Sequence, residues 1–178
     1  MRKVTLNVIR EMAHEAKGCI DKIYLHWTAG NYGNYSDEYH INIDSDGSII
    51  ASGRDLTELK SHTWHRNSNA VGVAMCCCAG AIAYSADNID FGSQPPTEKQ
   101  IDAMAKVVAV LCEELGLQIN SDNVMTHCEA AELDGYGPST TCERWDLWSL
   151  PDIPGDGVLK PGGDVIRGKA IWWESNGL

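Results

Sequence analysis

Two histidines stand at the ends of predicted strands, where a side chain can do metal chemistry. His26 closes an apolar run that starts at Lys22 and breaks at Ala29-Gly30, and His127 closes a second, shorter run. Strand ends present side chains to sites, and neutral imidazole is the commonest metal ligand in proteins. A catalytic zinc ion commonly takes three protein ligands and leaves a fourth position for water. The two histidines therefore predict a zinc site that needs one more ligand.

Several side chains near His127 could supply the third ligand. The candidates are Cys128, Asp134, Cys142 and Asp146. Cys128 is disfavoured because, if the strand continues, its side chain points to the face opposite His127. The residue types alone leave the other three candidates open.

The elements that would carry these residues begin with a helix and a hairpin. Helical spacing of apolar residues predicts an amphipathic helix over 6–16, followed by the strand that ends at His26 and a polar loop over 31–36. Tyr39, Ile41 and Ile43 alternate, and the Asp46-Gly47 turn precedes a return run at Ile49-Ile50. Residues 38–51 therefore predict a β-hairpin.

The second half of the chain contains a central strand and a well-delimited helix. Residues 70–79 form an unbroken apolar run, which predicts a strand buried on both faces. Thr97 and Gln100 form a capping box, and Gly116 ends the helix that they begin. Its apolar face consists of Ile101, Met104, Val108, Leu111 and Leu115.

The remaining segments give weaker patterns. We expect loops over 87–96 and 151–163, irregular chain over 128–142, and a small extra element over 164–178. The length of 178 residues suits one domain. We therefore expect a single domain over 1–178, with a core at about 20–150 and a C-terminal extension, 151–178, packed on it.

Composition excludes some functions. The net charge of −11 argues against nucleic-acid binding and against a polybasic contact with a membrane. We find no signal peptide and no apolar run long enough to span a bilayer. The seven cysteines, three of them consecutive at Cys76 to Cys78, are expected to be free and mostly buried. No CxxC pair occurs, so a zinc ribbon is excluded.

Short motifs in a fixed order carry a family resemblance. They are His26-Trp27-Thr28-Ala29, Tyr39-His40 with Ile43-Asp44 and Asp46-Gly47, His62 ahead of Asn69-Ala70-Val71-Gly72-Val73, the helix opened by Thr97, and Thr126-His127 with Glu129. Together they resemble the zinc-dependent N-acetylmuramoyl-L-alanine amidases. That group includes phage T7-type lysozyme, muropeptide amidases of Gram-negative bacteria and animal peptidoglycan recognition proteins. The resemblance covers about residues 20–150.

The resemblance implies a fold and a metal site. It implies an α/β fold with a mixed central β-sheet flanked by α-helices and a zinc-containing groove. His26 and His127 would be the first two ligands. The third ligand in such enzymes is a Cys or Asp two positions after a basic residue, a form that Arg144-Trp145-Asp146 has. We therefore expect Asp146 as the ligand and keep Asp134 and Cys142 as alternatives.

This chain departs from the family pattern near that ligand. The gap from His127 to Asp146 is longer than usual, and Arg144 replaces the more frequent Lys. The central strand carries no carboxylate that could act as general base, so catalysis would depend on zinc, Tyr39 and Arg144.

The resemblance also implies roles for residues around the metal. Tyr39 would orient the attacking water or hydrogen-bond the tetrahedral intermediate, and Arg144 would stabilise the oxyanion. Glu129 would orient an imidazole by accepting its N–H. The residues expected to bind substrate are His62, Trp64 and Asn69. His40 alternates away from Tyr39, so we assign it to structure.

The implied function is hydrolysis of the amide between N-acetylmuramic acid and L-alanine of the stem peptide. The cofactor would be Zn²⁺, the partner peptidoglycan or muropeptides, and the chain a monomer. The alternative is a recognition module that binds peptidoglycan without cutting it, as family members do when a zinc ligand is lost. We expect cytoplasmic synthesis, followed by antibacterial action on the cell wall after holin- or secretion-mediated release, or action on cytoplasmic muropeptides.

Overall fold

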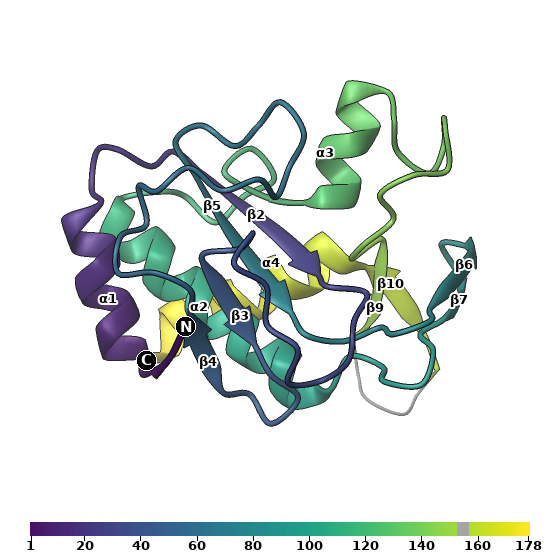
Figure 1. The fold of residues 1–178 in the computed structure, drawn as a ribbon, viewed down its shortest axis with the longest axis horizontal. Helices are drawn as coiled ribbons and strands as arrows, with labels where there is room; N and C mark the ends of the chain where they lie inside the picture. The colour runs from purple at the N-terminus through teal and green to yellow at the C-terminus, as the bar shows by residue number, and fades with distance from the viewer. Residues whose placement is uncertain (153–156) are drawn as a thin grey trace.

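Six strands form the central sheet of the computed structural model, which describes residues 1–152 and 157–178 (Figure 1). Their order is β1 (Arg2–Val4), β4 (Ile49–Ala51), β3 (Ile41–Ile43), β5 (Ala70–Met75), β2 (Lys22–Trp27) and β8 (Val124–Thr126). The strands β3, β5, β2 and β8 run parallel to one another, whereas β4 is antiparallel to both β3 and β1. The predicted α/β fold with a mixed central sheet is therefore confirmed.

The side chains of strand β2 alternate between the two faces of the sheet. Because successive side chains in a strand point to opposite faces, Ile23, Leu25 and Trp27 share one face. These three side chains belong to the main hydrophobic core, together with side chains of the helices on that face. Tyr24 packs in a smaller apolar cluster, and His26 shares its face. The alternation thus places His26 opposite the main core.

Helix α2 (Glu98–Leu115) covers the core face, and α1 (Leu6–Glu15) and α4 (Gly162–Asn176) both pack against it (Figure 1). It begins at the predicted capping box, in which Thr97 Oγ1 accepts from the Gln100 amide and Gln100 Oε1 accepts from the Thr97 amide, each at 3.1 Å. It ends at Gly116, whose φ of 75° closes the helix in the left-handed conformation. No helix in the described part of the chain is long and apolar enough to cross a membrane.

The predicted hairpin and central strand are also present. Strands β3 and β4 pair antiparallel with Ile43 opposite Ile49, and the Asp46-Gly47 turn joins them. Strand β5 lies between β2 and β3 and is buried along its whole length. Cys76 to Cys78 follow it as free, buried thiols, as expected.

The structure corrects the prediction of irregular chain over 128–142. Helix α3 (His127–Asp134) begins there, so His127 is the first residue of a helix. Thr126 and Glu129 form a second capping box, with Thr126 Oγ1 accepting from the Glu129 amide at 3.1 Å and Glu129 Oε2 accepting from the Thr126 amide at 2.8 Å. This spacing is readable in the sequence as Thr-x-x-Glu. Helix α3 lies on the face opposite α2, where its Ala130 packs with Tyr24.

The C-terminal segment is also more regular than predicted. It forms α4, an element of 15 residues, instead of a small extra piece. Strands β9 (Ser149–Pro151) and β10 (Leu159–Pro161) pair antiparallel, β9 at the start of the expected loop and β10 inside it; residues 153–156 of that loop lie outside the described residues. A further hairpin, β6 (Ile82–Ser85) with β7 (Asn88–Asp90), overlaps the loop expected over 87–96.

A buried arginine joins α4 to α3. Arg167 Nη1 donates to the Val124 carbonyl at 2.9 Å, and its two terminal nitrogens donate to Glu129 at 2.9 and 2.7 Å. Nη2 also donates to Asp164 Oδ1 at 2.7 Å. Because Glu129 belongs to the capping box of α3, this network fixes the N-terminus of the helix that begins with His127.

We expect Arg167→Met to lower the free energy of unfolding by about 2 to 4 kcal/mol, because it leaves the Glu129 carboxylate without its cation. Urea unfolding measures this loss. The matched control is Arg10→Met, since Arg10 bonds Glu113 and Glu114 at the surface and should lose less than about 1 kcal/mol. Equal losses in the two variants would contradict the role given to Arg167.

Candidate metal centre

Three side chains from distant parts of the sequence converge opposite the main core. His26, His127 and Asp146 each offer one ligand atom, and these atoms lie within 4.8 Å of one another. Asp146 Oδ2 is 3.1 Å from His26 Nδ1, and Asp146 Oδ1 is 3.4 Å from His127 Nδ1. The Nδ1 atoms of both rings therefore face one carboxylate.

His26 and Asp146 are held in the charge states that bind metal. Burial lowers the pKa of His26 below its ordinary value, so its imidazole is neutral at neutral pH. Burial by itself raises the pKa of Asp146, but hydrogen bonds with His127 and His26 outweigh it and hold this pKa well below its usual value. Two imidazoles and a carboxylate are a donor set that suits zinc. The residues therefore fit a metal ion.

A different part of the fold holds each of the three ligands in place. His26 lies in β2, between two parallel strands, and His127 is fixed by the capping box of α3. Asp146 lies in irregular chain, yet both of its neighbours are anchored. The ring of Trp145 packs edge-on against Trp27 with centroids 5.5 Å apart, and Leu147 is fully buried.

The outer nitrogens of the two imidazoles have partners that the sequence did not indicate. His26 Nε2 is 3.3 Å from Thr63 Oγ1, and His127 Nε2 is 3.4 Å from the Tyr136 hydroxyl. The expectation that Glu129 orients an imidazole is not met, because both of its carboxylate oxygens are engaged by the Thr126 amide and Arg167. Glu129 orients the helix instead.

The alternative ligands lie away from the cluster. Asp134 accepts two hydrogen bonds from the Arg66 guanidinium at 2.6 and 2.7 Å. Cys142 is exposed, with its thiol 3.5 Å from the Pro138 carbonyl. Cys128 is a buried thiol that lines a different cavity. Among the four candidates, Asp146 is the one that the fold brings to both histidines.

A groove of about 610 Å³ opens onto the cluster. Tyr39 and Arg144 both line it, and the Tyr39 ring lies 5.0 Å from that of His26. Burial raises the pKa of Tyr39, and the nearby Asp146 carboxylate raises it further, so the phenol keeps its proton. The groove thus combines a neutral hydroxyl donor with a guanidinium.

Two of the three expected substrate-binding residues line the groove. His62 and Trp64 line the groove, and Trp64 is 59% exposed and packs edge-on against Tyr136. Asn69 does not line the groove; it precedes β5, where its carbonyl accepts from the Asp21 amide. Asn67 lies in the groove instead. His40 is structural, since its Nε2 bonds the Glu58 carbonyl and its Nδ1 accepts from the Gly72 amide.

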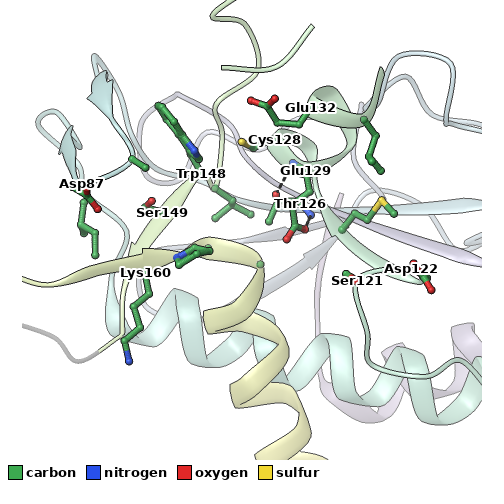
Figure 2. Close-up of a pocket in the computed structure, with 18 residues that line it drawn as sticks. Asp87, Ser121, Asp122, Thr126, Cys128, Glu129, Glu132, Trp148, Ser149 and Lys160 are labelled. Carbon is green, nitrogen blue, oxygen red and sulfur yellow. Dashed lines mark hydrogen bonds between the residues drawn. The ribbon is translucent and has the colours of Figure 1, made fainter. Parts of the chain in front are cut away.

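A second cavity, also about 610 Å³, lies on the other side of α3. Figure 2 shows Cys128, Glu129 and Glu132 of α3 on one side of it and Trp148, Ser149 and Lys160 on the other. It contains none of the three clustered residues, so the chemistry belongs to the groove described above.

The buried histidines predict that the metal-free protein loses stability in acid. Burial lowers the pKa of His40 below its ordinary value, and burial together with neighbouring imidazoles lowers that of His62 to about 2. Below a pH of about 6.5 the unfolded chain therefore binds protons that the folded chain does not, and the free energy of unfolding falls. We expect His62 by itself to account for a loss of about 1 kcal/mol between about pH 7.5 and about pH 5.5, measured by urea unfolding with a chelator.

The pH effect has a matched control. His14→Gln alters a side chain that is 74% exposed and should keep the full dependence on pH, whereas His62→Gln should reduce it. An unchanged pH dependence in His62→Gln would show that this buried imidazole is not responsible.

Comparison with known proteins identifies the family. The sequence profile described as N-acetylmuramoyl-L-alanine amidase matches residues 14–145, which is more than half of the chain. Comparison with curated proteins gives no match.

Similar solved structures include two from Clostridium intestinale URNW. The endolysin N-acetylmuramoyl-L-alanine amidase LysCS has 17% identity and a TM-score of 0.43, and the match covers 61% of this chain and 69% of that one. The N-acetylmuramoyl-L-alanine amidase LysC has 18% identity and a TM-score of 0.42, and the match covers 61% of this chain and 70% of that one. PGRP-Hd from Alvinella pompejana has 21% identity and a TM-score of 0.41 over 70% of this chain and 76% of that one. The family assignment rests on the profile alone: the chain belongs to the N-acetylmuramoyl-L-alanine amidase family.

Proposed function

We propose that this chain is a zinc-dependent hydrolase of the amide between N-acetylmuramic acid and L-alanine in peptidoglycan or muropeptides. The observation that carries the proposal is the Asp146 carboxylate, whose oxygens face the Nδ1 atoms of both His26 and His127. A recognition module without catalysis would be expected to lack one of these ligands. Membership of the amidase family supports the choice of substrate.

The three clustered residues would hold Zn²⁺. When bound, the ion supplies Lewis-acid chemistry: it polarises a carbonyl and lowers the pKa of a coordinated water. His26 and His127 would contribute their imidazoles, and Asp146 would contribute the one negative charge of the set. Because Asp146 is the one anionic ligand, the site with Zn²⁺ bound would carry a net positive charge. That charge would favour binding of the electron-rich oxygen of an amide.

The residues of the groove would bind and orient the amide. The Tyr39 phenol holds its proton at Oη and donates to the oxygen on which negative charge develops. Arg144 adds a permanent positive charge at the same groove. Trp64, exposed and packed against Tyr136, offers an apolar wall on which a sugar or peptide can lie.

We expect the purified protein to bind about one Zn²⁺ per chain and Asp146→Ala to lose it, because two imidazoles alone make an incomplete site. Metal content after dialysis, measured by mass spectrometry, checks this. Cys142→Ser and Asp134→Asn change the other two candidate ligands and should both retain zinc. Full zinc content in Asp146→Ala would place the third ligand elsewhere.

Digestion of purified peptidoglycan should release stem peptides that begin with a free L-alanine amino group. Mass spectrometry of the products identifies them, and a chelator should abolish their appearance because the ion supplies the Lewis acid. His26→Ala should be inactive. Release of new reducing sugar ends by the zinc-loaded protein would refute the amidase activity, and binding to peptidoglycan without any cleavage would favour the recognition module.

A further inference from the structure

Helix α4 carries two adjacent tryptophans that the metal groove does not use. Trp173 is anchored to α2, because its Nε1 donates to Asp102 Oδ1 at 2.8 Å and the Lys106 ammonium lies 4.2 Å from its ring centroid. The Trp172 ring meets that of Trp173 edge-on, with centroids 4.7 Å apart, and Trp172 is 55% exposed. One exposed ring needs no explanation by itself. This ring, however, borders a cavity.

The cavity, called the α4 hollow below, has a volume of about 430 Å³ and lies where α4 packs beside α2 (Figure 1). Asp164, Gly168 and Trp172 line it at intervals of four residues, so they lie along one face of α4. Asp102 of α2 and Asp152, the residue after β9, line it from the other elements. The α4 hollow and the metal groove have no lining residue in common.

Gly168 keeps the α4 hollow open. It lies in the middle of α4, where glycine makes a helix less stable than alanine does. A Cβ added to Gly168 would meet no atom within 4 Å, so no neighbouring element requires a glycine here. Its φ is not positive either. The missing side chain thus weakens the helix and leaves an empty space beside Trp172, as a binding site for a ligand would need.

The charges around the α4 hollow favour a neutral ligand. Asp152 Oδ2 pairs with Lys160. Asp164 Oδ1 pairs with Arg167. Because both carboxylates have cationic partners and Lys169 adds a positive charge to the lining, a cationic ligand would gain little. The net charge of −11 disfavours an anionic ligand.

The same carboxylates can still accept hydrogen bonds. In the described part of the chain, no donor bonds Asp152 Oδ1 or Asp164 Oδ2. An ionised carboxylate only accepts, so these two oxygens match a ligand with hydroxyl or amide donors. The Trp172 ring offers a wide apolar surface to the same ligand. The α4 hollow therefore matches a neutral molecule with one apolar face and hydroxyl groups at its edge.

We propose that the α4 hollow is a saccharide-binding site. A pyranose ring has a face of C–H groups that can stack on the Trp172 indole, and its hydroxyls can donate to the Asp152 and Asp164 carboxylates. The volume of about 430 Å³ is within the usual range of small-molecule sites. The class of ligand follows from the α4 hollow itself. Its identity as a neutral N-acetylhexosamine of the peptidoglycan glycan strand rests on the proposed function.

The consequence concerns the polymeric substrate. Because the α4 hollow and the metal groove share no residue, a glycan strand can occupy one while a stem peptide of the same polymer lies in the other. Attachment at a second point raises the effective concentration of the polymer at the groove. The α4 hollow would thus retain the protein on peptidoglycan between cleavage events.

The test uses the full chain, ¹⁵N-labelled and with a chelator present, titrated with the tetramer of N-acetylglucosamine. In ¹H–¹⁵N correlation spectra, the Trp172 indole and the Gly168 amide should shift as the tetramer binds. Trp172→Ala should weaken binding about 10-fold or more, as loss of an aromatic anchor does. The matched control is Ile171→Ala, since Ile171 is 46% exposed and does not line the α4 hollow; it should bind as the wild type does.

A second variant keeps the test decisive if Trp172→Ala is unstable. Gly168→Leu fills the α4 hollow with a residue of higher helix propensity, so α4 should stay folded while binding weakens about 10-fold or more. Equal binding by Gly168→Leu and the wild type would overturn the proposal, as would the absence of shifts at Trp172 and Gly168 in the wild type. So would a wild-type dimer that Trp172→Ala converts to a monomer, because a second copy would then cover this face.

Failure of the proposed function would be recognised separately. The tetramer carries no stem peptide, and the titration requires no zinc. Shifts at the α4 hollow without any release of stem peptides from peptidoglycan would therefore support the saccharide site while refuting the amidase. Cleavage of peptidoglycan without these shifts would do the reverse.

Discussion

The buried carboxylate of Asp146 is the constraint on which the site depends. A carboxylate withdrawn from water is destabilising by several kcal/mol unless donors or charges compensate for it. Here the compensation comes from the two imidazoles that face its oxygens. The irregular chain after α3 must therefore bring Asp146 back to His26 of β2. The packed side chains of Trp145 and Leu147, on either side of Asp146, hold it there.

The sheet supplies the space for this cluster. Alternation along β2 directs Ile23, Leu25 and Trp27 into the main core and His26 to the other face. In the neighbouring strand β5, Gly72 and Ala74 lie opposite Tyr24 and His26. Small side chains at these positions leave room for imidazoles where a larger residue would fill the groove, and the close approach of His62 to Gly72 shows how tightly that room is used.

Helix α4 extends the structural support of the site beyond the segment that the family profile matches, residues 14–145. Arg167 connects α4 to the capping box of α3 and thereby to the residue that follows it, His127. Helix α3 contributes His127 to the metal cluster and Cys128, Glu129 and Glu132 to the cavity of Figure 2. The C-terminal segment is thus part of the framework that orients a ligand.

Local patterns were sufficient for much of the fold. The capping box at Thr97 predicted the start of α2 and Gly116 predicted its end, because each signal acts within one helical turn. The same reasoning applied to Thr126 and Glu129 would have predicted α3, and that signal was missed. Strand alternation and the Asp46-Gly47 turn were likewise sufficient for the hairpin. The family motifs indicated His26 and His127 as candidate ligands.

The sequence by itself therefore determined α2, the β3–β4 hairpin, the central strands and the two histidines, since periodicity and capping depend on residues near one another in the chain. The residue types left Asp134, Cys142 and Asp146 open, and the family resemblance favoured Asp146. The tertiary structure separated them by pairing Asp134 with Arg66 and exposing Cys142. The sequence likewise gave no indication of Thr63 beside His26 or of Asn67 in place of Asn69. Contacts between side chains on different elements depend on how the sheet, α3 and the loops pack, and no local spacing encodes that packing.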